Sequence, residues 1–267
     1  MKRSLLILAA LLAACSEGSS IVSIRQNQED QNEAAVLSAS DATVEDVGVL
    51  YASDLSMAST GAAPGAARAG WTFDNPCTYV PETGRFTCPP VSDGGLTLTR
   101  DYAFFDAGNH AMSAFDQALT ASANFHVAVT GVHTAENGAD TVSRDRSMTV
   151  AGLAGTETSR SWNGTGTRSD GGYRNIEGVI RRYHTNDVVT FTNIVVSLPR
   201  AQHRWPVSGS ITRQLTGTGS VVRNGVERSF SVSKTVTITF DGTQYATVTV
   251  GGESHKLDLA TGRTTRN

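Results

Sequence analysis

Alternation of apolar and polar residues, which runs from Trp71 to the C-terminus, is the feature that most constrains the fold of this 267-residue chain. A period of two places successive side chains on opposite faces, as in a half-buried β-strand. Hairpin signals separate the alternating runs: Asn-Gly at 137–138 and 224–225, Asp-Gly at 170–171 and 241–242, and Gly-Gly at 251–252. Together they predict an antiparallel meander and exclude a βαβ arrangement.

The turn at Asn224-Gly225 allows a strand register to be predicted. If these two residues form the turn, the facing pairs are Ile211 with Ile238, Gly217 with Val232, and Gly219 with Phe230. An aromatic ring opposite a glycine is a recognised way of covering bare backbone. We therefore expect Phe230 to lie over Gly219.

The next turn, at Asp241-Gly242, leaves two registers open. A two-residue turn sets Ile238 opposite Tyr245, whereas a loop one residue longer, or a bulge, pairs Ile238 with Ala246 and Val236 with Val248. A one-residue slip exchanges the faces of a strand, so burial favours the longer loop. Beyond it, Gly251-Gly252 closes a hairpin that places Ala246 opposite Leu257 and Val248 opposite His255.

Two cysteines flank the segment CTYVPETGRFTC. Folding it as a hairpin about Glu82-Thr83 places Cys77 opposite Cys88, where β-carbons approach to roughly 4.5–5.5 Å. We expect a structural disulfide, because the spacing is not the Cys-x-x-Cys of redox pairs. A zinc site would need two further ligands, which no other Cys or close His pair supplies. No metal and no cofactor is therefore expected.

One interval departs from the period of two, the segment NHAMSAFDQALTAS from Asn109 to Ser122. Met112, Phe115 and Leu119 are spaced for one helical face, and Asn109 is a residue type that caps helices. This pattern predicts a short helix that packs across a sheet or closes one end of it.

The N-terminus has the order of an export signal. Lys2 and Arg3 precede an apolar run from Leu5 to Ala14, which is shorter than the about 20 residues that span a bilayer. The sequence Leu12-Ala13-Ala14-Cys15 resembles the lipobox of bacterial lipoproteins. The resemblance implies cleavage before Cys15, diacylglycerol on its sulfur and acylation of the new amine. Two or more acyl chains anchor a protein stably. Ser16, being other than Asp, implies an outer-membrane destination.

The segment that follows is acidic. Between residues 16 and 60 there are eight Asp and Glu and one Arg, with two weakly helical stretches at 28–39 and 43–57. Thr43 with Asp46 three residues later is a candidate capping pair, and Val44, Val47 and Leu50 have helical spacing. Residues 61–70 form a Gly- and Ala-rich linker. We favour a solvated tether over an acidic arm for a partner.

These observations define the domains and the fold class. The predicted domains are a lipoprotein signal peptide (1–14), an acidic tether and linker (15–70) and an antiparallel β domain (71–267). The predicted class is all-β, an antiparallel meander with one short helix, preceded by a flexible or helical N-terminal tether. A curved sheet, a sandwich and a partly closed barrel all satisfy the turn spacing.

The sequence contains no catalytic motif. Ser231 and Lys234 have the spacing of a Ser-x-x-Lys dyad, but on a strand they point to opposite faces. The six histidines are scattered; only His126 and His133 share a neighbourhood, and no carboxylate is patterned beside them. The net charge of −3 and the 18% charged residues argue against a strongly basic nucleic-acid-binding protein.

Arginines are concentrated from Arg160 to Arg213, where eight occur with three acidic residues and interleaved aromatic residues. Arginine binds phosphate and stacks on rings, so this stretch is a candidate anion-binding surface. Its candidate residues are Arg181, Arg182, Arg200 and Arg204. The alternative is that Arg is the default cation here, because the whole chain has only three lysines.

Three hypotheses for function follow. The first is a non-enzymatic, lipid-anchored protein of the bacterial envelope that binds or scaffolds at the membrane surface, with a lipid or an anionic envelope polymer as its partner. The second is a secreted hydrolase of envelope polymers whose active site is assembled from distant residues. The third is an anion-binding module formed by the stretch from Arg160 to Arg213. No nucleic-acid partner is expected.

Overall fold

The computed structural model describes residues 28, 31–32, 34–40, 42–48, 50, 77–135, 138–176, 179–223 and 225–266. Within these ranges it leaves out the side chains of His133, Ala135, Arg174, Ile176, Val179, Arg181 and Arg223.

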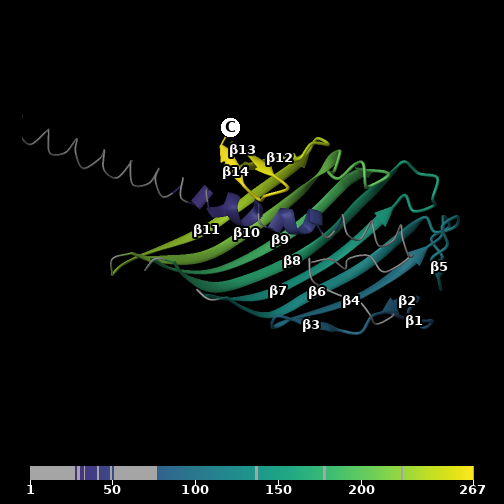
Figure 1. Cartoon of the computed structure of the whole chain (residues 1–267), viewed down its shortest axis with the longest axis horizontal. Coiled ribbons are helices and arrows are strands. Elements are labelled where there is room, and N and C mark those ends of the chain that lie inside the picture. The colour runs from purple at the N-terminus through teal and green to yellow at the C-terminus, as the bar shows by residue number, and fades with distance from the viewer. Residues whose placement is uncertain are drawn as a thin grey trace, which may run out of the picture.

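The described residues form one antiparallel sheet and a helical N-terminal segment (Figure 1). The strands are β1 (Thr78–Val80), β2 (Arg85–Thr87), β3 (Val91–Asp93), β4 (Leu96–Phe105), β5 (Ala111–Met112), β6 (Ser122–Ala135), β7 (Gly138–Ala151), β8 (Ser159–Ile176), β9 (Val179–Ser197), β10 (Ser208–Arg223), β11 (Val226–Phe240), β12 (Tyr245–Val250), β13 (Glu253–Asp258) and β14 (Thr264–Arg266).

The strands follow each other in sequence order, as a meander requires. The path is β1-β2-β4-β6-β7-β8-β9-β10-β11-β12-β13-β14, while β3 and β5 each pair with β4. The sheet curves strongly and does not close, since β1 and β14 stand at its two ends (Figure 1). Of the predicted arrangements, the single curved sheet is therefore the one observed.

The two faces of the sheet differ in chemistry, as the alternation predicts. We call the inner face the one that carries the buried side chains, and the outer face the opposite one. On β11, burial alternates so that Val232, Val236 and Ile238 are buried while Ser231, Ser233 and Thr235 are exposed or half-buried. The largest inner-face side chains that are completely buried include Trp162, Phe125, Ile194, Ile211, Ile238 and Leu257.

The predicted registers are confirmed at two turns. Ile211 faces Ile238 and Gly217 faces Val232 across β10 and β11, and Ala246 faces Leu257 across β12 and β13. A β-carbon added at Gly219 would lie 2.4 Å from the Phe230 ring, so this ring does cover the glycine.

The register between β11 and β12 corrects the prediction. Ile238 faces Val248 and Val236 faces Val250, two positions beyond the expected partners. The loop is longer because Asp241 accepts hydrogen bonds from the backbone N–H and the hydroxyl of Thr243, at 3.0 and 2.7 Å. Such a local turn consumes extra residues. The shift is even, so the predicted faces are kept.

The predicted helix from Asn109 to Ser122 is wrong. This interval contains the short strand β5, a loop and one isolated turn before β6 begins. Asn109 has a positive φ of 63°, which a helix does not allow. The Asp116 carboxylate accepts hydrogen bonds from the N–H groups of Ala118 and Leu119, which closes a single turn that does not continue.

The acidic segment is helical where the structure describes it, at residues 28, 31–32, 34–40, 42–48 and 50, which agrees with the helical stretches predicted at 28–39 and 43–57. It packs on the inner face, and Ala35, Val36 and Leu50 belong to the same buried core as the sheet. The described part of the expected solvated tether thus packs against the sheet, with one face buried. Residues 51–57 of the second predicted helical stretch and the linker at 61–70 lie outside the described residues.

Thr43 does not cap the helix as predicted. Its hydroxyl donates to the carbonyl of Ala39, one turn back, at 2.7 Å, so Thr43 is an interior helical residue. Asp46 is used elsewhere, as described below. The predicted apolar spacing is nevertheless confirmed, since Val47 and Leu50 are buried and Val44 packs against the core.

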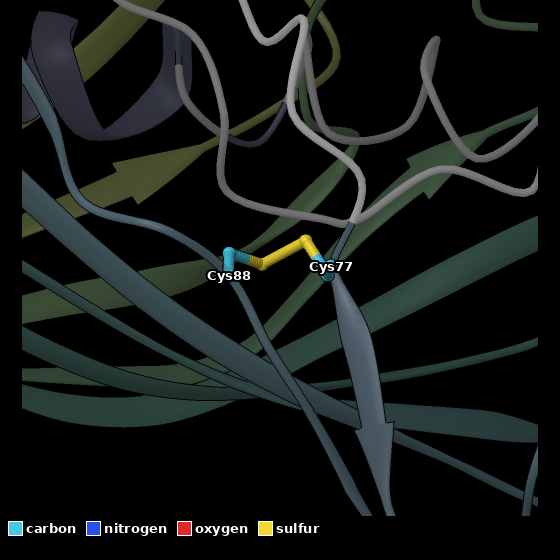
Figure 2. The surroundings of a disulfide bond; sticks show 2 residues. All are labelled: Cys77 and Cys88. Atoms are coloured by element: carbon cyan, nitrogen blue, oxygen red, sulfur yellow. A yellow bond between two sulfur atoms is a disulfide. The ribbon is translucent and has the colours of Figure 1, made fainter.

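The disulfide between Cys77 and Cys88 is present, and Figure 2 shows it joining the chain just before β1 to the chain just after β2. The hairpin between them has the predicted register, with Tyr79 opposite Phe86 and Val80 opposite Arg85. Phe86 stacks on Tyr102 at a ring separation of 4.8 Å. The disulfide therefore closes an aromatic hairpin at the β1 end of the sheet.

Candidate functional site: an arginine-lined groove

The inner face of β6–β10 forms a groove that holds the acidic helix through buried ion pairs. Arg213 on β10 is 1% exposed and lies at its centre. Its guanidinium donates hydrogen bonds to Asp187 on β9 and to Asp46 on the helix. These two carboxylates are themselves 4% and 8% exposed, so the whole triad is withdrawn from water.

A second arginine also binds Asp46. The Nε atom of Arg146 on β7 lies 3.2 Å from Asp46 Oδ1. Burial alone would raise the pKa of Asp46, but the positive charges of Arg146 and Arg213 outweigh it and lower this pKa below its ordinary value. Asp46 is therefore held as a carboxylate in the groove.

The ion pairs continue towards the ends of β7 and β8 that lie away from the β7–β8 connection, near Gly138 and Ile176. Arg144 donates a hydrogen bond to Glu45 of the helix, and its Nη2 atom lies 3.6 Å from Asp170 Oδ2. Arg168 forms an ion pair with the same aspartate. Burial opposes the charge of Arg168, yet Asp170 overrides this effect and raises the pKa of the guanidinium.

Glycines on β8 make room for these long side chains. A β-carbon at Gly166 would lie 2.6 Å from Cδ of Arg146, and one at Gly164 would lie 2.6 Å from the sulfur of Met148. The stems of Arg146 and Met148 thus lie directly over bare backbone. The Arg146 guanidinium also lies 6.0 Å from the centre of the Phe191 ring.

The groove is apolar next to its charged part. A cavity of about 60 Å³ remains between the helix and the sheet, and Leu50, Phe125 and Val127 are among its lining residues. Within the described structure, Asp187 Oδ1 and Arg213 Nε have no hydrogen-bond partner. The helix therefore fills the groove without satisfying all of its polar atoms or all of its apolar space.

The charges of the groove balance only when the helix is counted. Within this network the sheet contributes four arginines (Arg144, Arg146, Arg168 and Arg213) and two aspartates (Asp170 and Asp187). The sheet side thus has an excess of two positive charges, which Glu45 and Asp46 of the helix neutralise. This surface is built to hold carboxylates beside an apolar patch.

The outer face carries a separate cluster around His126. Its Nδ1 atom lies 3.2 Å from Asp101 Oδ2 and its Nε2 atom lies 2.8 Å from Asp145 Oδ2. Asp101 is also bound by Arg85. The hydrogen bond with Asp145, opposed by partial burial and supported by Asp101, raises the pKa of His126. Only the imidazolium donates from both ring nitrogens, so both are engaged as donors to carboxylates.

The cluster corrects the expectation that no carboxylate lies beside His126. Asp101 and Asp145 come from β4 and β7, on either side of β6, and sequence spacing alone does not reveal this pairing. The side chain of His133 lies outside the described residues. Among the described residues, no group of three or more His, Cys, Asp or Glu side chains is arranged to hold a metal ion.

The four candidate anion-binding arginines do not form one site. Arg182 lies near the start of β9, whereas Arg200 and Arg204 lie beyond its end, roughly 50 Å away at about 3.3 Å per strand residue. Arg200 is buried and donates to the His203 carbonyl at 2.7 Å, and Arg204 stacks on Trp205 at 4.9 Å. The side chain of Arg181 lies outside the described residues.

Arg182 does line a shallow, open hollow of about 700 Å³ at the far ends of β9–β11. Tyr183, His184, Glu227 and Phe230 are among its other lining residues. The hollow is therefore mixed in charge, and it lacks the excess of arginine that the groove has.

The residues of the groove were not identifiable from sequence. Arg213 lies inside the arginine-rich stretch, but its partner Asp46 is 167 residues away, and Arg144 and Arg146 precede the stretch. The sequence did contain one signal. The N-terminal segment has a surplus of acidic residues, and Arg144 and Arg146 at alternate positions of β7 have the complementary charge. That signal does not fix which face the helix covers.

Comparisons with known proteins identify no relative. A scan against protein-family models, a search of curated proteins and a search of solved structures returned no match to this chain. Within the part of the chain that the structure describes, no helix is long and apolar enough to cross a membrane. Cys15 precedes the described residues.

Proposed function

We propose that this protein is a non-enzymatic, lipid-anchored protein of the bacterial envelope that acts as a binding module at the membrane surface. The lipobox resemblance implies that acyl chains on Cys15 anchor the protein in the membrane. In the same family, a residue other than Asp after the cysteine, here Ser16, implies an outer-membrane location. The curved sheet supplies the binding surface. In this proposal the groove belongs to a protein that is anchored in the envelope by its acyl chains.

One observation carries the binding role: the inner face of the sheet forms a groove that already holds a helix. Groove arginines such as Arg213 and Arg146 bind carboxylates, and apolar side chains such as Phe125 and Phe191 flank them. A groove that combines an apolar wall with a few fixed polar groups is the usual form of a binding site. Of the arginines between Arg160 and Arg213, Arg168 and Arg213 belong to the ion-pair network of the groove. The anion-binding alternative therefore becomes the binding of carboxylates by these two arginines.

Mass spectrometry of the N-terminal peptide tests whether Cys15 carries the lipid anchor. The full chain is expressed in a bacterial host, and the mass of its N-terminal peptide is compared with that of the Cys15→Ser variant. We expect a peptide that starts at Cys15 with diacylglycerol and an amide-linked acyl chain, and a membrane-bound protein. The variant is expected in the soluble fraction. A wild-type peptide that carries an unmodified Cys15 would refute the proposal.

The hydrolase alternative is tested on the outer-face cluster. Both ring nitrogens of His126 are bonded to carboxylates, so neither is free to take a proton from a nucleophile. We expect a screen of envelope polymers to give no turnover above the background of the His126→Gln variant. Turnover that disappears in this variant, while the His203→Gln control keeps it, would instead establish an enzyme.

A further inference from the structure

We infer that the groove is a receptor for an acidic amphipathic helix of a partner protein, and that this chain's own helix, described at residues 34–40 and 42–48, occupies it as an intramolecular substitute. The inference rests on the proposed binding role and names its ligand class. The site is defined by Arg144, Arg146 and Arg213 for the carboxylates and by the apolar wall around Phe125 and Phe191.

The helix now in the groove shows which chemistry fits it. Residues 28–50 contain six Asp and Glu and no Lys or Arg. Glu45 and Asp46, which are adjacent in sequence, meet three arginines on two strands, β7 and β10. Its apolar contacts come largely from small side chains such as Ala35, Val36 and Ala39. A helix with adjacent carboxylates and a narrow apolar stripe is therefore the matching ligand.

The vacant groove requires an anionic occupant. Among the described residues, loss of Asp46 would leave the Arg213 guanidinium with Asp187 alone and would leave Arg146 without a carboxylate partner. Leaving a buried charge without its partner is strongly unfavourable. A neutral apolar helix would incur this cost, whereas an acidic helix would avoid it. The groove thus selects for charge as well as for shape.

Release of the chain's own helix would break no strand pairing of the sheet. The helix is joined to β1 only through residues 51–76, and it contributes no strand to the hydrogen-bonded sheet. Its fit is incomplete, because a cavity remains beside Leu50 and Asp187 Oδ1 has no hydrogen-bond partner among the described residues. Tethering compensates for a modest fit, since a short linker gives an effective concentration of the order of millimolar. A better-fitting external helix is then a competitor.

The test measures helix binding in trans to the full chain, made soluble by Cys15→Ser. A fluorescent peptide of residues 28–50 is titrated into this protein and into the same protein with Asp46→Asn. The substitution weakens the internal competitor but leaves the groove intact, so we expect the peptide to bind the variant at least about tenfold more tightly. The exposed control Asp93→Asn should bind the peptide as the parent does. Glu45→Gln, a milder change, should give an intermediate affinity.

Further measurements distinguish an acidic helix from a lipid or a second copy of this chain as the ligand of the groove. A peptide with Glu45→Gln and Asp46→Asn should lose at least about tenfold in affinity for the Asp46→Asn protein; equal binding of both peptides overturns the inference. Binding of phosphatidylglycerol vesicles without peptide binding makes the groove a lipid site, and a stable dimer of the parent chain makes a second copy the occupant. Either result also overturns it. Near-ultraviolet circular dichroism, to which the buried Trp162 contributes, verifies that each variant is folded. Acylation of Cys15 is measured independently.

Discussion

Asp46 connects the helix to the sheet more than any other described residue. It pairs with Arg146 and Arg213, and it is almost completely buried. Removal of one charge from a buried pair leaves the other uncompensated. We therefore expect Asp46→Asn to lower the free energy of unfolding by about 3–5 kcal/mol, measured in urea at neutral pH.

The control for this prediction is Asp93→Asn, a change of the same chemistry at an exposed position on β3. A surface substitution of this kind shifts stability by less than about 0.5 kcal/mol. Equal effects of the two substitutions would show that the Asp46 ion pairs do not hold the helix.

His126 is expected to make stability depend on pH. Because its pKa is raised in the folded state, its ion pairs contribute fully below its unfolded pKa, about 6.5. This contribution is lost as the pH rises through the folded pKa. Wild type should therefore lose stability relative to His126→Gln as the pH rises above about 6.5. Urea unfolding at several pH values measures the difference.

His203 provides the comparison for this titration, since its side chain is exposed and lies in a loop. His203→Gln should follow the wild-type pH dependence. A difference between wild type and His126→Gln that stays constant over the whole range would contradict the role of the Asp101 and Asp145 pairs.

At the scale of elements, β8 depends on glycine to let Arg146 reach the helix. A β-carbon at Gly166 would lie 2.4 Å from the carbonyl oxygen of Asp145 and 2.6 Å from Cδ of Arg146. Gly166→Ala should therefore destabilise the fold by about 1–3 kcal/mol, because backbone and Arg146 both have to move. Thermal unfolding measures this loss.

Gly48 is the matched position on the helix, where an added β-carbon meets nothing within 4 Å. Alanine is the better helix former, so Gly48→Ala should stabilise the protein by about 0.5–1 kcal/mol. A loss of stability at Gly48, or none at Gly166, would show that the surroundings of these two glycines are not as described.

The hairpin of β1 and β2 is stabilised by its disulfide. The bond closes a loop with a sequence separation of 11, and constraint of the unfolded chain by a loop of this size contributes about 2–3 kcal/mol. Replacement of Cys77 and Cys88 by Ser should lower stability by this amount in denaturant unfolding. Reduction of the wild type should give the same curve, and a curve unchanged by reduction would contradict the role.

Sequence reasoning succeeded where local rules decide the element. The turn at Asn224-Gly225 fixed the register of β10 and β11, because a two-residue turn leaves one pairing that buries Ile211 and Ile238 together. It failed at Asn109–Ser122, where helical spacing of Met112 and Phe115 was outweighed by a positive φ at Asn109 and by a side-chain turn at Asp116. Periodicity does not report such side-chain to backbone hydrogen bonds.

At the scale of the whole molecule, the fold class followed from the sequence but the groove did not. Alternation fixes which side chains share a face, yet it does not fix the curvature of the sheet or what covers it. The contact of Asp46 with Arg213 spans 167 residues, so it depends on how β7–β10 curve around the helix. The helical spacing of Val47 and Leu50 was the one local sign in the sequence that this helix packs against another surface, and both side chains are buried in the structure.

The position of the helix between Cys15 and the sheet gives docking a mechanical consequence under the proposed function. With the helix docked, residues 16–27 alone bridge the anchor and the body, a reach of at most roughly 40 Å. With the helix released, residues 16–76 bridge them, with a reach of roughly 200 Å when extended. Under the proposed function, binding of an acidic partner helix would thus lengthen the chain between the anchor and the sheet.

Docking of the acidic helix in the groove is measured by the distance between two spin labels on the full-length Cys15→Ser protein. The labels are placed at exposed Leu37 on the helix and exposed Val226 on β11, each changed to Cys. Double electron–electron resonance should give one narrow distribution of distances between the two labels. The distribution should broaden when the labelled protein also carries the substitution Asp46→Asn. A broad distribution in the parent, or a narrow one that Asp46→Asn leaves unchanged, would contradict a helix held by its ion pairs.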